Sequence, residues 1–130
     1  MTDAPTNGHQ RKLLSAIGRY NAEHYIWGQK CDGWYLLNDP ELAVIEEQMP
    51  AGTSEALHYH EHAQQFFFML FGEAMMEVDD QEVRLTAGEG LHIPAGRRHR
   101  LRNSSTHMIR FLVISRPPSH GDRVDIPTRR

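Results

Sequence analysis

Three histidines and one glutamine have the types and the spacing to hold a divalent metal ion. One residue separates His58 from His60, so in a β-strand both imidazoles would point to the same side. Neutral imidazole is the commonest protein ligand for divalent transition metals. Gln65 could add a carbonyl oxygen, and His99 lies far along the chain, so the fold would have to bring them together. Such a set leaves coordination positions open, as Lewis-acid or oxygen chemistry requires.

A His-x-His pair taken alone is more often a surface feature than a metal ligand. The chain has nine histidines. Six of them are interpreted as having no metal role: His9, His24, His62, His92, His107 and His120. His62 is the nearest competitor, because it shares strand parity with His58 and His60. The turn-forming residues around His58, His60 and His99 distinguish these three from the rest.

Short segments rich in β-branched and aromatic residues recur along the chain, separated by Gly, Pro, Asn and Asp. Such even spacing of short strands and turns is typical of a β-sandwich or barrel. The segments predicted as strands are 25–27, 34–37, 42–48, 58–60, 65–71, 74–78, 82–85, 91–93, 99–101 and 108–115. Asp79-Asp80-Gln81 is predicted to be a hairpin tip.

Composition excludes several classes of protein. At 130 residues the chain fits one domain. Its formal charge of −3 argues against a nucleic-acid partner. The longest apolar run, 66–71, is far shorter than the ~20 residues that a membrane helix needs. The single cysteine, Cys31, allows no internal disulfide, and no signal peptide is evident. We therefore expect a cytoplasmic protein that binds neither nucleic acid nor membrane.

Two blocks of the sequence resemble the paired motifs of the cupin family. The family's first block has a glycine, a His-x-His pair, a glutamate and a second glycine. Its second block has a glycine, a Pro-x-Gly corner, a histidine and an asparagine. Nine of the ten positions carry the family's residue here: Gly52, His58, His60, Gly72, Gly88, Pro94, Gly96, His99 and Asn103. The tenth is Gln65, where the family usually has glutamate.

The resemblance implies an all-β fold, a double-stranded β-helix or jelly-roll (cupin) barrel. It also implies a divalent transition metal inside the barrel, held by His58, His60, Gln65 and His99. Iron, manganese, nickel and zinc all suit such a set, so the ligands do not decide between them. Glutamine brings no charge and is a weaker donor than glutamate. Gln65 is therefore either a fourth ligand or a residue that supports a site of three histidines.

The segment 65–71 bears on oligomeric state because it is apolar on both faces. By strand alternation, Phe67 and Met69 lie on one side, and Phe66 and Leu70 on the other. One face can line the barrel, and the other needs a cover. A second sheet, the N-terminal arm or another subunit could supply it. We predict a homodimer, because so short a chain has little material to spare.

The chain is predicted to divide into three parts. Residues 1–24 would form an N-terminal arm, partly disordered or helical, and residues 25–118 the barrel. Residues 119–130 would form a polar tail. For this tail, disorder is favoured over a segment that folds across the barrel mouth. Within the barrel, four apolar residues are predicted to line or underlie the pocket: Phe67, Met69, Met75 and Phe111.

The leading functional hypothesis is a metal-dependent cupin acting on a small organic molecule. The resemblance implies dioxygenase-type chemistry first, with isomerase or lyase chemistry also known in the family. The alternative is a non-catalytic cupin that binds or senses a sugar or an organic anion. A third hypothesis is a barrel whose metal site has decayed. No catalytic residue beyond the metal ligands is predicted, although Tyr59 and His62 are considered as proton donors.

Overall fold

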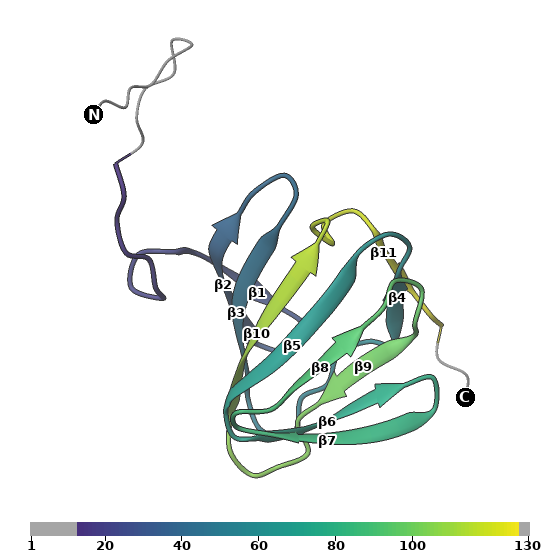
Figure 1. Cartoon of the computed structure of the whole chain (residues 1–130). Coiled ribbons are helices and arrows are strands. Elements are labelled where there is room, and N and C mark those ends of the chain that lie inside the picture. The colour runs from purple at the N-terminus through teal and green to yellow at the C-terminus, as the bar shows by residue number, and fades with distance from the viewer. Residues whose placement is uncertain (1–12, 128–130) are drawn as a thin grey trace.

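The structure is a computed structural model, and it describes residues 13–127. Two antiparallel sheets face each other, one of six strands and one of five. The strands are β1 (Glu23–Trp27), β2 (Cys31–Asn38), β3 (Ala43–Met49), β4 (His58–His60), β5 (Gln64–Phe71), β6 (Glu73–Val78), β7 (Gln81–Thr86), β8 (Gly90–Ile93), β9 (His99–Arg102), β10 (Ile109–Arg116) and β11 (Arg123–Asp125). The orders are β1-β2-β3-β10-β5-β8 and β11-β4-β9-β6-β7 (Figure 1). The all-β double-stranded β-helix predicted from the sequence is confirmed.

Strand alternation places the core between the two sheets. On β5, Phe67 and Met69 are buried, and on β10, Phe111 and Val113 face the same interior. Apolar residues of the second sheet, such as Leu101, complete this core. Met75 was predicted to line the pocket, but it has the outward parity on β6. Its neighbours on either side are the buried ones, so the prediction for Met75 is wrong.

Two turns show how the sequence sets the register between strands. Asp79 and Asp80 join β6 to β7 with φ of 48° and 72°, as the predicted hairpin tip requires. Gly72, with φ of 86°, joins β5 to β6. A Cβ at Gly72 would lie 2.8 Å from the side chain of Ile109, so both backbone angle and space favour glycine there.

Asn103 ties the end of β9 to the end of β3. Its buried side-chain amide donates to the backbone carbonyls of Met49, Pro50 and His107, at 2.9–3.1 Å. Its carbonyl oxygen accepts from the backbone and the hydroxyl of Ser105. An amide that serves both as donor and acceptor in this way fixes the position of the strand that carries His99.

The segment before the barrel contains no helix within residues 13–22. Gly18 begins a turn, with the backbone N–H groups of Asn21 and Ala22 donating to its carbonyl. β1 then begins at Glu23, slightly before the predicted start of the first strand. The expectation of disorder for residues 1–12 lies outside the described residues.

The C-terminal segment folds back across the barrel, in contrast to the disorder favoured from the sequence. β11 pairs with β4, and Arg123 lies opposite His60. The carboxylate of Asp122 accepts hydrogen bonds from the backbone N–H groups of Glu61, His62 and Ala63, at 2.8–3.1 Å. Backbone N–H groups occur at almost every residue, so the sequence gives no sign that these three bind Asp122. For this reason disorder was favoured for the tail. Residues 13–127 include no helix with the length and apolarity needed to cross a membrane.

Candidate metal centre

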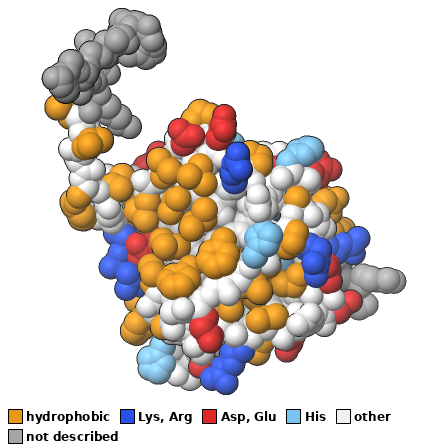
Figure 2. Space-filling view, in the orientation of Figure 1, with side chains coloured by type: hydrophobic (Ala, Val, Ile, Leu, Met, Phe, Trp, Pro, Cys, Tyr) orange, Lys and Arg blue, Asp and Glu red, His pale blue; other side chains and the backbone are white. Residues whose placement is uncertain are grey.

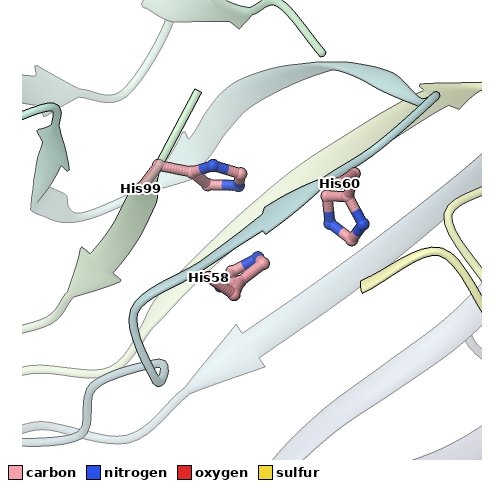
Figure 3. A group of neighbouring side chains, drawn as sticks. All are labelled: His58, His60 and His99. Atoms are coloured by element: carbon pink, nitrogen blue, oxygen red, sulfur yellow. The ribbon is translucent and has the colours of Figure 1, made fainter. Parts of the chain in front are cut away.

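The structure brings His58, His60 and His99 together between the two sheets. His58 and His60 project from β4, and His99 lies directly opposite His58 on β9 (Figure 3). The ring centroids are 4.3 Å apart for His58 and His99, 5.1 Å for His58 and His60, and 5.9 Å for His60 and His99. One nitrogen from each ring lies within 4.8 Å of the others, and all three side chains are buried. A single ion could therefore contact all three rings.

Gln65 reaches this cluster from the opposite sheet. Its carbonyl oxygen lies 3.2 Å from Nε2 of His99, and its amide nitrogen donates to the hydroxyl of Ser115 at 3.0 Å. Ser115 is the direct partner of Gln65 across β10 and β5. The side chain of Gln65 is buried and fixed at both ends, so its oxygen is held at the histidine cluster.

The surroundings keep the imidazoles neutral near neutral pH. Burial lowers the pKa of His58 to about 4. Burial and the neighbouring charges of His58 and His99 lower the pKa of His60 to about 4. The pKa of His99 is lowered as well, first by burial and then by His58. Neutral imidazole is the form that coordinates a metal, so the site is ready to bind without first losing protons.

The hydrogen-bonding pattern of the cluster fits a bound cation. Nδ1 of His58 lies 2.7 Å from the carbonyl of Ala56, and Nδ1 of His99 lies 2.9 Å from that of Arg97. These carbonyls orient both rings with Nε2 toward the cluster. His99 then faces oxygen acceptors at both nitrogens, although a neutral imidazole has one N–H. A cation bound by Nε2 of His99 and the oxygen of Gln65 would satisfy both atoms.

His60 completes this fit. Its Nδ1 is buried and has no hydrogen-bond partner among the described residues. An unpaired buried nitrogen costs roughly 1–3 kcal/mol, so natural proteins seldom keep one without a ligand or water. The donor set consists of three imidazoles and one amide oxygen, which suits iron, manganese, nickel or zinc.

The cluster opens into a cavity of about 840 Å³ between the sheets. Phe67 contributes to its wall, as the sequence predicted. Pro118, Ser119 and His120 of the C-terminal segment also line the cavity. From the sequence, disorder was favoured for residues 119–130 over a segment that folds across the barrel mouth. A cavity of this size can hold a small organic molecule beside the metal site.

A second polar group in this cavity was missed from the sequence. Tyr25 of β1 donates a hydrogen bond of 2.7 Å to the carboxylate of Glu47 on β3, and Glu55 lies nearby. Burial, followed by the charge of Glu55, raises the pKa of Glu47 to about 8. Burial also raises the pKa of Tyr25 and that of Glu55. Glu47 shares parity with Ala43 and Ile45, and that inward parity was the available clue.

A second group of metal-binding residue types has a structural explanation. Glu61, His62 and Asp122 lie close together at the protein surface. The carboxylate of Asp122 is already engaged by three backbone N–H groups. This group therefore serves to hold the C-terminal segment in place. The suggestion that His62 donates a proton inside the cavity finds no support, since His62 is exposed and does not line it.

Comparison with known proteins matches the geometry. The family model described as "Cupin domain" matches residues 45–115. Quercetin 2,3-dioxygenase of Bacillus subtilis is 36% identical over 77 residues, which are 58% of this chain and 23% of that protein. An oxalate-binding protein of Thermotoga maritima is 27% identical over 67 residues, which are 52% of this chain and 55% of that protein. The matched region thus spans less than two thirds of either relative.

Solved structures share the fold. The polyketide cyclase RemF from Streptomyces resistomycificus superposes with a TM-score of 0.78. The superposition covers 90% of this chain and 88% of the cyclase, at 16% sequence identity. Identity at this level supports the common barrel and carries no information on activity.

The raised pKa of Glu47 predicts a specific pH dependence of stability. Below its ordinary pKa of 4.5, Glu47 is protonated in both the folded and the unfolded chain. Between 4.5 and about 8, only the unfolded chain is ionised, so the free energy of unfolding falls as pH rises. The loss is at most about 1.4 kcal/mol per pH unit. Glu47→Gln cannot ionise, so the variant should gain stability relative to the wild type over this range.

Urea unfolding of both metal-free proteins across this pH range measures the difference. The other titratable groups around Glu47 are Tyr25, Cys31, Glu55 and Arg123, and they are common to both proteins. Glu46→Gln is the matched control, because Glu46 points to the opposite face of β3 and pairs with Arg110. Parallel stability curves for the wild type and Glu47→Gln would contradict the assigned burial of this carboxyl group.

Proposed function

The chain belongs to the cupin domain family, and from this membership we propose that it is a metal-dependent cupin acting on a small organic molecule. In this proposal His58, His60, His99 and Gln65 hold a divalent transition metal at the inner end of the cavity. The observation that carries it is the convergence of three buried, neutral imidazoles on one point. A bound metal would supply Lewis acidity or, if redox-active, oxygen activation.

The residues of the chain define how such a site would work. The three imidazoles and the amide of Gln65 add no negative charge, so the ion would keep its full charge toward a substrate. Phe67 and Tyr35 offer aromatic walls for a flat molecule. The C-terminal segment narrows the cavity, which excludes part of the bulk water. These features favour a small molecule with hydroxyl or enol oxygens that can reach the metal.

Dioxygenase-type chemistry is the reaction we propose first. Its support is the 36% identity to a quercetin 2,3-dioxygenase over 77 residues, 58% of this chain. Binding without turnover is the second candidate, and the similarity to an oxalate-binding protein supports it.

We also propose that the protein acts as a homodimer in a reducing compartment such as the cytoplasm. The outer face of the six-stranded sheet carries exposed apolar side chains around the Glu46–Arg110 ion pair, with Ile26, Phe66 and Leu70 at 63%, 38% and 37% exposure. Figure 2 shows hydrophobic side chains gathered on this face, over β2, β3, β10 and β5. An apolar patch of this kind on a small chain is typical of a subunit interface. Cys31 is a free, buried thiol, which suits a reducing environment.

Removing any of the three imidazoles should remove the metal. His58→Ala, His60→Ala and His99→Ala should each lower the content after reloading from about one ion per chain to below about one tenth. Gln65→Glu should raise the affinity about tenfold or more, since a charge in contact with the ion is worth well over 1.4 kcal/mol. Elemental analysis and competition with a chelator measure both effects.

His62→Ala is the matched control for these variants. It lies two residues beyond His60, but its side chain is exposed, so metal content should not change. Equal metal content in His58→Ala, His99→Ala and the wild type would contradict the proposed site. A wild-type protein that binds no metal would point instead to a barrel with a decayed centre.

Oxygen uptake separates the two candidate functions. Iron-loaded protein is mixed with catechols, diketones and thiols, and oxygen consumption is followed together with the organic product. An oxygenase should consume oxygen in proportion to product, and His58→Ala should abolish this activity. Tight binding of one compound, recovered unchanged and without oxygen uptake, would exclude the oxygenase and support the binder.

A charge on the outer sheet face should separate the subunits. Leu112 lies on β10, a central strand, and its side chain has the outward parity. Leu112→Glu would place a charge in the interface, so the sedimentation coefficient should fall from that of a dimer to that of a monomer. Wild-type protein that sediments as a monomer at micromolar concentration would contradict the dimer.

A further inference from the structure

A carboxyl group faces the cavity from the sheet opposite the histidine cluster. Glu47 lies on β3 with the inward parity, and its oxygen Oε2 accepts a hydrogen bond of 2.7 Å from the hydroxyl of Tyr25. Both residues line the cavity that also contains His58 and His60. A substrate bound at the histidines would therefore share its space with this pair.

The position of Tyr25 is fixed by the strand between the two residues. Tyr25 on β1 is the register partner of Gly33 on β2, and Gly33 is the partner of Glu47 on β3. Any side chain at Gly33 would clash, because a Cβ there would lie 2.1 Å from the ring of Tyr25. The ring thus crosses over the glycine to reach Glu47. The register of the three strands and the absence of a side chain at Gly33 therefore fix this contact. Among the described residues, no side chain donates a hydrogen bond to the second oxygen of Glu47.

Glu47 is distinguished from the other carboxylates of the cavity. The described residues that line it include four carboxylates: Glu23, Asp39, Glu47 and Glu55. Glu23 and Asp39 are exposed to solvent, where water competes for any proton or hydrogen bond. Glu55 is buried, but one of its oxygens accepts from the backbone N–H of Leu101 at 3.0 Å. Glu47 alone combines partial burial, an orienting partner and access to the cavity.

The cluster itself offers no good proton acceptor. Nδ1 of His58 and Nδ1 of His99 face backbone carbonyls, and Gln65 presents an amide oxygen, a far weaker base than a carboxylate. A hydroxyl group that binds a metal as its anion has to lose its proton to another group. Burial and then the nearby charge of Glu55 raise the pKa of Glu47 to about 8. Above that pH Glu47 is a carboxylate, a stronger base than an ordinary carboxylate, so it can accept a proton there and return it.

We propose that Glu47, positioned by Tyr25, accepts the proton of a hydroxylated aromatic or enolic substrate bound at the histidine cluster. This inference rests on the proposed metal site. In the step, the substrate O–H bond breaks, its electron pair stays on the substrate oxygen, and a new O–H bond forms on the Glu47 carboxylate. No electrons are transferred. Tyr25 acts as a positioning residue, and Glu47 as the catalytic one.

The substrate class follows from the same surroundings. Tyr25, Trp27, Tyr35 and Phe67 supply flat walls, and Glu47 supplies an acceptor. A second carboxyl group, Glu55, disfavours ligands that bring a free carboxylate to this side of the cavity. A catechol-like molecule, with two adjacent hydroxyl groups and an aromatic ring, satisfies these features better than a small organic anion does.

The test uses zinc-loaded protein and 4-nitrocatechol as the probe. Zinc has no redox chemistry, so it holds the probe without oxidising it, and proton transfer is observed apart from oxygenase activity. The experiment is run about one pH unit above the pKa of Glu47, where the group begins as a carboxylate. Difference infrared spectroscopy then records the C=O band of a newly protonated carboxyl group. A pH indicator in weak buffer counts the protons released to solvent.

Probe binding to the wild type should produce the carboxylic-acid band. In Glu47→Gln the band should disappear, and about one more proton per bound probe should reach the solvent. In Tyr25→Phe the band should remain but shift to higher frequency, because the phenol no longer bonds to the carboxyl group. Glu46→Gln, on the outer face of the same strand, should behave as the wild type does.

The outcomes separate this inference from the function it rests on. A band that persists in Glu47→Gln, or no band in wild-type protein that binds both zinc and the probe, overturns the assignment of Glu47. A band unchanged in frequency in Tyr25→Phe overturns the role of Tyr25. Wild-type protein that binds no zinc overturns the metal site and, with it, this proton transfer. Circular dichroism and zinc content of each variant confirm that the comparison is between folded, loaded proteins.

Discussion

The contact between His99 and its two oxygen acceptors is the constraint on which the centre of this protein depends. One carbonyl comes from its own chain segment, at Arg97, and the other oxygen comes from Gln65 in the opposite sheet. Burial holds the ring neutral, so its single N–H serves one of these oxygens and the other ring nitrogen keeps a lone pair. A buried lone pair of His99 that faces the side chain of Gln65 is the arrangement that a bound cation would use.

The barrel provides the rigidity that this arrangement needs. β4 and β9 place His58 and His99 side by side through a single register pair, so a slip of one residue would turn His99 away. The side-chain amide of Asn103 anchors the end of β9 to the end of β3. On the other sheet, Ser115 fixes the amide of Gln65. The four proposed ligands therefore lie on strands, which hold them more firmly than loops would.

Local patterns in the sequence predicted the strands of the barrel and the His58–His60 pair, whereas the resemblance to the cupin motifs implied that His99 joins them. Strand alternation placed His58 and His60 on one side, and glycines with positive φ, such as Gly72, marked the turns. The pairing of Tyr25 with Glu47 could not be predicted, because it depends on Gly33 lying between them in the sheet. That register exists only after folding. A glutamate in a short strand, without its neighbours, looks like a solvated surface residue.

The histidine cluster and part of the cavity wall lie on different segments of the chain, and the pairing of β11 with β4 holds the second segment in place. The three imidazoles sit on strands inside the barrel, whereas part of the cavity wall comes from residues 117–121, which follow the last strand of the six-stranded sheet. A substitution in this wall reshapes the chamber without moving a coordinating nitrogen. Substitutions in this wall would thus change which molecule the chamber accepts while leaving the proposed metal-binding residues in place.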